Sequence, residues 1–253
     1  MLELYRHEIS GGFYSWRGGI WIIAASLILS LVTYLLLTDK ELSLLGQGEM
    51  LWTTAEVILA LGFIMSAVTA ASAISGEIES GTLESLLLTP LTFRQISLQK
   101  LFSTITVWMI LYLVSIPYLI VISNGTNLGL SAILYVGLYG TLLTIGFSLI
   151  SIAISSKLKS SKNSIMSMIM IILILLAPSL FFASSLKKTD FGISIENINP
   201  VSHAINSIDS VVVDNEQLAL QQISHIWPVI LFTAFCGFIF TIITRHFEIR
   251  GLE

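Results

Sequence analysis

The fold is decided by a polar interruption between two long apolar segments, Gly76-Glu77-Ile78-Glu79-Ser80-Gly81-Thr82-Leu83-Glu84-Ser85-Leu86-Leu87-Leu88-Thr89-Pro90-Leu91. Glu77, Glu79 and Glu84 place three carboxylates within eight residues, so this segment cannot lie in the hydrocarbon of a bilayer. At helical spacing Glu77 and Glu84 occupy one half of the surface, while Glu79 projects within the apolar half. The pattern predicts a short amphipathic helix over residues 76–89 at a membrane surface, ended by Pro90. Its apolar residues are Ile78, Leu83, Leu86 and Leu87.

This segment resembles the motif of ABC type-2 permeases. The resemblance includes the basic residues that follow it, Arg94 and Lys100, and departs at Ser80, where relatives often carry a basic residue. In that family the motif is a cytoplasmic coupling helix that docks on the ATP-binding subunit. The resemblance therefore implies an ATPase-coupling interface formed by Gly76, Glu77, Glu79, Gly81, Thr82, Leu83, Glu84, Leu86 and Leu87.

The composition places the chain in a membrane. Of its 253 residues 55% are hydrophobic and only 11% are charged, whereas a soluble domain carries about 25% charged residues. The single cysteine, Cys236, lies in an apolar run, so the chain can form no internal disulfide and has no cysteine-based zinc motif. The first apolar run follows a polar, aromatic arm and is long enough to span, so we expect no cleavable signal there.

Six apolar segments are long enough to cross about 30 Å of hydrocarbon. We expect the fourth to lie inside the bundle, because its small residues, including Gly137, Gly140 and Gly146, allow close helix packing. Residues 1–17 are expected to form an interfacial helix, and the ABC type-2 resemblance implies an elbow helix at this place. The predicted spans are 19–37, 51–74, 97–122, 130–155, 164–184 and 226–244.

The basic residues predict the orientation. With the N-terminus in the cytoplasm, nine lysines and arginines fall on the inner side, and Lys40, Lys187 and Lys188 fall on the outer side. This positive-inside bias predicts cytoplasmic N- and C-termini and a cytoplasmic 76–89 segment. The nine inner residues are Arg6, Arg17, Arg94, Lys100, Lys157, Lys159, Lys162, Arg245 and Arg250.

The longest outer loop is predicted at residues 185–225 and is acidic. Within it Asn199-Pro200 predicts the start of a helix, with Asn199 as the N-cap and Pro200 in the first turn. Apolar residues recur along one face of this helix, so we expect it to dip partly into the outer leaflet. They are Val201, Ile205, Ile208 and Val212.

The sequence offers little chemistry of its own. It contains no phosphate-binding G-x-x-x-x-G-K-[ST] loop, so ATP and Mg²⁺ would be bound by a separate subunit. The four histidines show no metal-site spacing, and we expect no metal, no bound cofactor and no nucleic acid. Glu56 is the only charged residue well inside a span. Either it lines a substrate path, or its carboxylate reaches water at the helix end.

Together these features predict an all-α integral membrane protein, a single permease domain over residues 1–253. We expect it to be the non-enzymatic permease subunit of an ATP-driven exporter in the plasma membrane. It would act as a homodimer or with a similar permease, and with an ATP-binding-cassette ATPase. The substrate class, such as peptide, lipid or drug, stays open. The alternatives are a non-transporting anchor or sensor that recruits a cytoplasmic partner, and an intramembrane enzyme, for which the spans lack convergent acids, bases or metal ligands.

Overall fold

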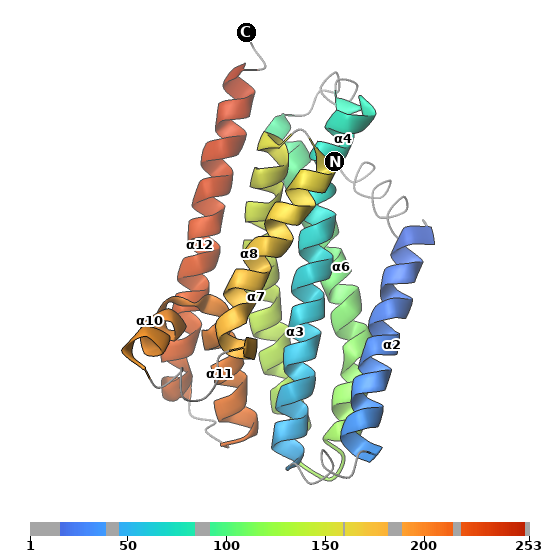
Figure 1. Ribbon diagram of the computed structural model, residues 1–253, viewed down its shortest axis with the longest axis vertical. Coiled ribbons are helices and arrows are strands. Elements are labelled where there is room, and N and C mark those ends of the chain that lie inside the picture. Colours follow the sequence, from blue (N-terminus) through green and yellow to red (C-terminus); the bar gives the residue numbers. More distant parts are fainter. Residues whose placement is uncertain are drawn as a thin grey trace.

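The computed structural model describes residues 16–38, 46–83, 92–158, 160–181, 189–214 and 219–250, and the regular elements in these ranges are all helices (Figure 1). The predicted all-α fold is thereby confirmed. The predicted elbow helix at residues 1–17 lies outside the described residues, except that Trp16 and Arg17 begin the first described helix.

Six of the described helices are long and apolar enough to cross a bilayer, which confirms the six predicted spans. They are α2 (Trp16–Thr38), α3 (Gln47–Ser72), α6 (Phe93–Ile122), α7 (Leu128–Lys157), α8 (Ser161–Phe181) and α12 (Ala219–Arg250). The last helix begins before residue 226, where the sequence placed its start. Gln222 falls within the loop predicted from the sequence, because its side chain is polar. In the structure that side chain is buried and bonds to the hydroxyls of Ser207 and Ser210, which fixes the first turn of α12 in the bundle.

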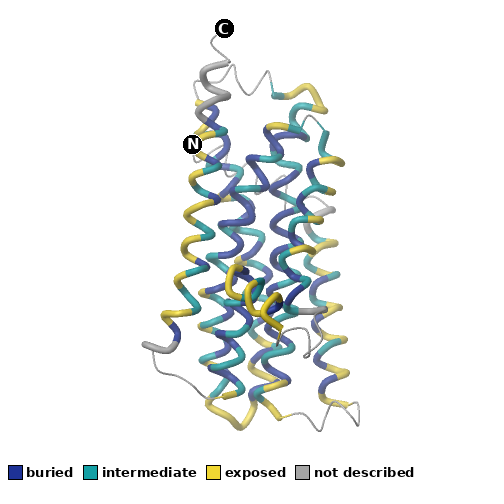
Figure 2. Tube along the Cα trace, turned by 60° about the vertical axis from the view of Figure 1, so that its left-hand side comes forward, coloured by how far each residue is buried: buried dark blue, intermediate teal, exposed yellow. Residues whose placement is uncertain are grey.

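Helix α7 occupies the centre of the bundle, as its small residues predicted. It packs against α3, α6, α8, α11 and α12, and buried residues follow the inward faces of the long helices while exposed ones face outward (Figure 2). The Trp108 indole of α6 is fully buried. A Cβ at Gly62 would lie 2.2 Å from it, and a Cβ at Gly140 would lie 2.1 Å from it. The two glycines therefore make room for the largest side chain of the core.

Two shorter helices, α10 (Asp190–Ile198) and α11 (Pro200–Val212), lie toward the end of the bundle opposite α4 (Ser75–Ser80) (Figure 1). The predicted cap is confirmed: the side-chain oxygen of Asn199 accepts hydrogen bonds from the backbone N–H groups of Val201 and Ser202. The predicted apolar face of α11 is buried, and the helix packs against α3, α7, α8 and α12. It is therefore inserted into the bundle.

Asn199 also joins this helix pair to α8. Its Nδ2 donates to the backbone carbonyl of Leu175, 2.6 Å away, close to Pro178, which has no N–H for the helical ladder. Asn199→Ala should lower the free energy of unfolding by about 1–3 kcal/mol, because both the cap and this link are lost. Thermal unfolding in detergent micelles measures the change. Asn199→Ser retains a capping oxygen, so its free energy of unfolding should fall by less. An equal fall in the two variants would contradict the assigned cap.

Candidate functional site

The polar segment forms a shorter helix than the sequence predicted. Helix α4 spans only Ser75–Ser80, and Gly81 follows it with φ 71° and ψ 12°, in the left-handed region. The prediction of one continuous helix over 76–89 is therefore wrong at Gly81 and Thr82, and residues 84–89 lie outside the described residues. Glycine adopts this conformation without a Cβ penalty, and the backbone N–H groups of Gly81 and Thr82 close the last turn on the Glu77 carbonyl, which ends the helix.

Helix α4 begins at a short break after α3, and the hydroxyl of Ser155 on α7 holds this break. The Ser155 oxygen accepts hydrogen bonds from the backbone N–H groups of Ile74, at 3.2 Å, and Ser75, at 2.9 Å. It also lies 3.1 Å from the Ser75 hydroxyl. Ser75 and Ser155 are fully buried, so the start of α4 is fixed to the central helix of the bundle.

Glu77 joins α4 to α6. Its Oε1 lies 2.9 Å from Nζ of Lys100, and its other carboxylate oxygen accepts a hydrogen bond from Thr82. The side chains of Lys100 and Glu77 are only 11% and 26% exposed, so the ion pair is largely shielded from water. The sequence alone leaves open which carboxylate of the 76–89 segment meets the basic residues that follow it, Arg94 and Lys100. In the structure Glu77 is the acid that pairs with Lys100.

Glu79 joins α4 to the first turn of α8. Its Oε1 lies 3.0 Å from the backbone nitrogen of Ser161, the first residue of α8, and accepts that hydrogen bond. The first N–H groups of a helix have no partner within the helix, and the helix dipole favours a negative charge there. Glu79 therefore acts as an external cap for α8.

The electrostatics of both acids follow from these contacts. The candidate span that includes α3 and α4 has 34 residues, about 51 Å at ~1.5 Å per residue, so α4 at its polar end extends beyond ~30 Å of hydrocarbon. Burial raises the pKa of Glu77, but hydrogen bonds from Thr82 and Lys100 and the Lys100 charge outweigh it, and the net pKa is lowered. The Ser161 hydroxyl and backbone N–H, with the Ser160 hydroxyl, lower the pKa of Glu79. Both contacts are therefore present at neutral pH and weaken as the pH falls below the ordinary carboxyl range.

The other residues of the predicted interface are only partly described. Ile78 packs on a buried apolar cluster that includes Ile74 and Phe93, as its place on the apolar face predicted. Leu83 is half-buried. Glu84, Leu86 and Leu87 lie outside the described residues.

Glu56, the candidate for the substrate path, is half-buried in α3. It lies 19 positions before Ser75, about 28 Å along a helix, so it belongs to a different part of the molecule.

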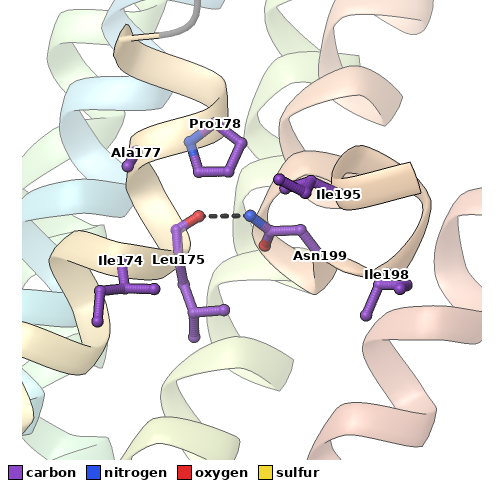
Figure 3. Close-up of a pocket in the computed structure, with 7 residues that line it drawn as sticks. All are labelled: Ile174, Leu175, Ala177, Pro178, Ile195, Ile198 and Asn199. Carbon is purple, nitrogen blue, oxygen red and sulfur yellow. Dashed lines mark hydrogen bonds between the residues drawn. The ribbon is translucent and has the colours of Figure 1, made fainter. Parts of the chain in front are cut away.

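A cavity of about 410 Å³ lies between α8 and the α10–α11 junction (Figure 3). Its polar lining atoms are already engaged, since Asn199 bonds to the Leu175 carbonyl and caps α11. The cavity therefore offers a hydrocarbon surface rather than a site for chemistry. It is lined by Ile174, Leu175, Ala177, Pro178, Ile195, Ile198 and Asn199.

Two histidine side chains meet in a way that their spacing in the sequence does not indicate. Within the described ranges no three His, Cys, Asp or Glu side chains come together as a metal site. However, His203 of α11 and His225 of α12 meet, with their Nδ1 atoms 3.5 Å apart. They are 22 positions apart in the chain, and only the packing of α11 on α12 brings them together.

The role of Ser155 leads to a prediction. Ser155→Ala removes the acceptor for the Ile74 and Ser75 N–H groups, so it should lower the free energy of unfolding by about 1–2 kcal/mol and speed hydrogen exchange at these two amides. Ser156→Ala is the matched control, because the Ser156 hydroxyl donates to Ala153 within α7. Hydrogen exchange followed by mass spectrometry tests both variants, and unchanged exchange in Ser155→Ala would contradict the assigned role.

Six candidate membrane-spanning helices around a buried centre, with a polar helix fixed at one end, define a multi-pass membrane protein. The family described as "ABC-2 family transporter protein" matches residues 13–248, nearly the whole chain. The chain therefore belongs to the ABC-2 transporter family and is a membrane permease component of an ABC transporter. Permeases of this family normally work with an ATP-binding subunit. No curated protein gives a significant match to the chain.

Proposed function

We propose that this permease couples ATP hydrolysis by a separate ATP-binding-cassette subunit to export of a substrate, and that α4 with the residues after it receives the ATPase. The observation that carries the proposal is the attachment of α4. A helix that receives force must be fixed to the parts that move, and α4 is joined to three spans. Ser155 ties it to α7, Glu77 to Lys100 of α6, and Glu79 to the start of α8.

This arrangement indicates which residues of the segment hold α4 in the bundle and which remain for the ATPase. Glu77 and Glu79 are engaged within the chain, so in our proposal they transmit movement from α4 to α6 and α8. Contact with the ATPase then falls to exposed positions at the end of α4, Ser80 to Thr82, and to the residues that follow. Of the predicted interface set, Gly81, Thr82, Leu83, Glu84, Leu86 and Leu87 fall in this part. Glu77 and Glu79 belong to the attachment, and Gly76 lies between Ser75 and Glu77 in α4.

Export is the direction that the resemblance to ABC type-2 permeases implies, and the proposed orientation rests on the basic residues. The excess of lysine and arginine on the α4 side supports a cytoplasmic α4 and cytoplasmic termini in the plasma membrane. ATP and Mg²⁺ would be bound by the ATPase. A second permease, identical or similar, would form the other half of the path. Glu56 is proposed to face that path, and transport or substrate selectivity altered in Glu56→Gln would support this role.

Copurification and flux test the proposal. The full chain, expressed with its candidate ATPase and reconstituted in vesicles, should retain the ATPase through purification and move substrate only with hydrolysable ATP. A stable complex without ATP-dependent flux of any tested substrate class would favour the alternative, an anchor or sensor that recruits a cytoplasmic partner. Failure to bind any ATP-binding subunit would overturn the proposal.

A further inference from the structure

The two histidines at the end of the bundle opposite α4 are arranged as a pair of metal ligands. His203 is on α11 and His225 is in the first part of α12. Their ring centroids are 5.7 Å apart and the ring planes make an angle of 59°, while the Nδ1 atoms are only 3.5 Å apart. The rings therefore meet through their Nδ1 edges and do not stack.

The backbone of α10 fixes the state of one ring. Nε2 of His203 lies 3.0 Å from the carbonyl oxygen of Asn197. A carbonyl only accepts hydrogen bonds, so this Nε2 carries the hydrogen. In the neutral ring the lone pair is then on Nδ1, which faces His225. Metal-bound histidines are typically held in this way, by a hydrogen bond from the second ring nitrogen to a backbone carbonyl or a carboxylate.

The spacing suits a shared cation better than a direct hydrogen bond. Hydrogen bonds from N–H donors are usually about 2.7–3.2 Å long, so 3.5 Å is long for this contact. Two nitrogens that each lie about 2.0–2.1 Å from one zinc ion, at the tetrahedral angle, are separated by about 3.4 Å. We propose that His203 and His225 form a binding site for a divalent transition-metal ion such as Zn²⁺, with the two Nδ1 atoms as its protein ligands.

The surroundings fit such an ion. Both histidines are only partly buried, so water completes the coordination shell, as it does where a protein supplies fewer than four ligands. The segment 185–225 contains five carboxylates and only two lysines, which favours the approach of cations. A bound ion bridges α11 and α12 and stabilises their packing.

Metal binding is tested on the purified full-length chain in detergent after treatment with a chelator. Zn²⁺ should raise the temperature of thermal unfolding, whereas Mg²⁺, which prefers oxygen ligands, should not. His203→Ala and His225→Ala should each abolish the zinc-dependent shift, and His7→Ala and His246→Ala should retain it. Bound Cu²⁺ should show electron paramagnetic resonance couplings to two imidazole nitrogens.

Each result decides the question. A zinc-dependent shift that is lost in both variants, together with two-nitrogen coupling, supports the site. No shift in the native chain, or a shift that persists in His203→Ala and His225→Ala, overturns it and leaves a hydrogen-bonded pair. If an alanine variant is not folded, His225→Gln retains a polar side chain of similar size without an imidazole, and its zinc response decides in the same way.

Discussion

Glu77→Lys should reduce ATP-driven transport at least about tenfold while leaving the protein in the membrane. The substitution removes a charge-assisted hydrogen bond worth about 1.5–3 kcal/mol and places two cations together at a site that is largely shielded from water. Helix α4 would then lose its attachment to α6. Transport in vesicles and ATP hydrolysis by the same complex are measured together, and hydrolysis should persist while transport falls.

The reciprocal exchange is the control for this prediction. In the double variant Glu77→Lys with Lys100→Glu the pair can form again with its charges reversed, so transport should recover in part. Lys100→Glu alone should resemble Glu77→Lys. If the double variant is as impaired as the single ones, the ion pair between α4 and α6 does not carry the effect. If Glu77→Lys transports normally, the proposed attachment has no role in transport.

Gly140→Ala should strongly reduce the yield of folded protein. The added Cβ would lie 2.1 Å from Cζ2 and 2.3 Å from Cη2 of Trp108, and Gly62 is packed so closely on the same indole that a Cβ there would lie 2.2 Å from Cζ3. Overpacking in a close-packed core costs about 1–3 kcal/mol and occasionally more, and the second glycine leaves the ring little room to move. Size-exclusion chromatography and thermal unfolding in detergent measure the loss.

Two further variants show whether Trp108 causes the effect. Gly237→Ala is the matched control, because its Cβ would meet only Leu149, at 3.9 Å, an ordinary contact. It should be close to neutral. Trp108→Leu removes the six-membered ring, so Gly140→Ala should cost less in that background than in the native one. Equal costs in both backgrounds would contradict the assigned contact.

The sequence predicts the large elements well because each depends on a local property. The six spans follow from apolar length, the central position of α7 from its small residues, and the start of α11 from Asn199-Pro200. Sequence patterns fail to predict the structure where a single residue ends a helix or where a contact between distant segments sets a pairing. Helical periodicity passes through Gly81 without indicating a left-handed residue, and it does not show which carboxylate of the segment meets Lys100.

Contacts between segments that are far apart in the chain cannot be predicted from any local sequence pattern. The hydrogen bond from the Ser161 N–H to the Glu79 carboxylate joins residues 82 positions apart, and the Ser155 contacts with residues 74 and 75 join residues about 80 apart. The meeting of His203 and His225 likewise depends on how α11 lies on α12. A histidine at each place is visible in the sequence, but their distance is set by tertiary packing alone.

The position of Trp108 constrains how such a permease changes shape. Its indole, carried by α6, packs closely against Gly62 of α3 and Gly140 of α7, so one side chain contacts the backbone of both neighbouring helices. Sliding or rotating one of these three helices against the others would drive backbone into the ring. We therefore expect α3, α6 and α7 to move as a single rigid body, and the rearrangements that open and close a path to occur at its margins, where α2, α8 and α12 meet it.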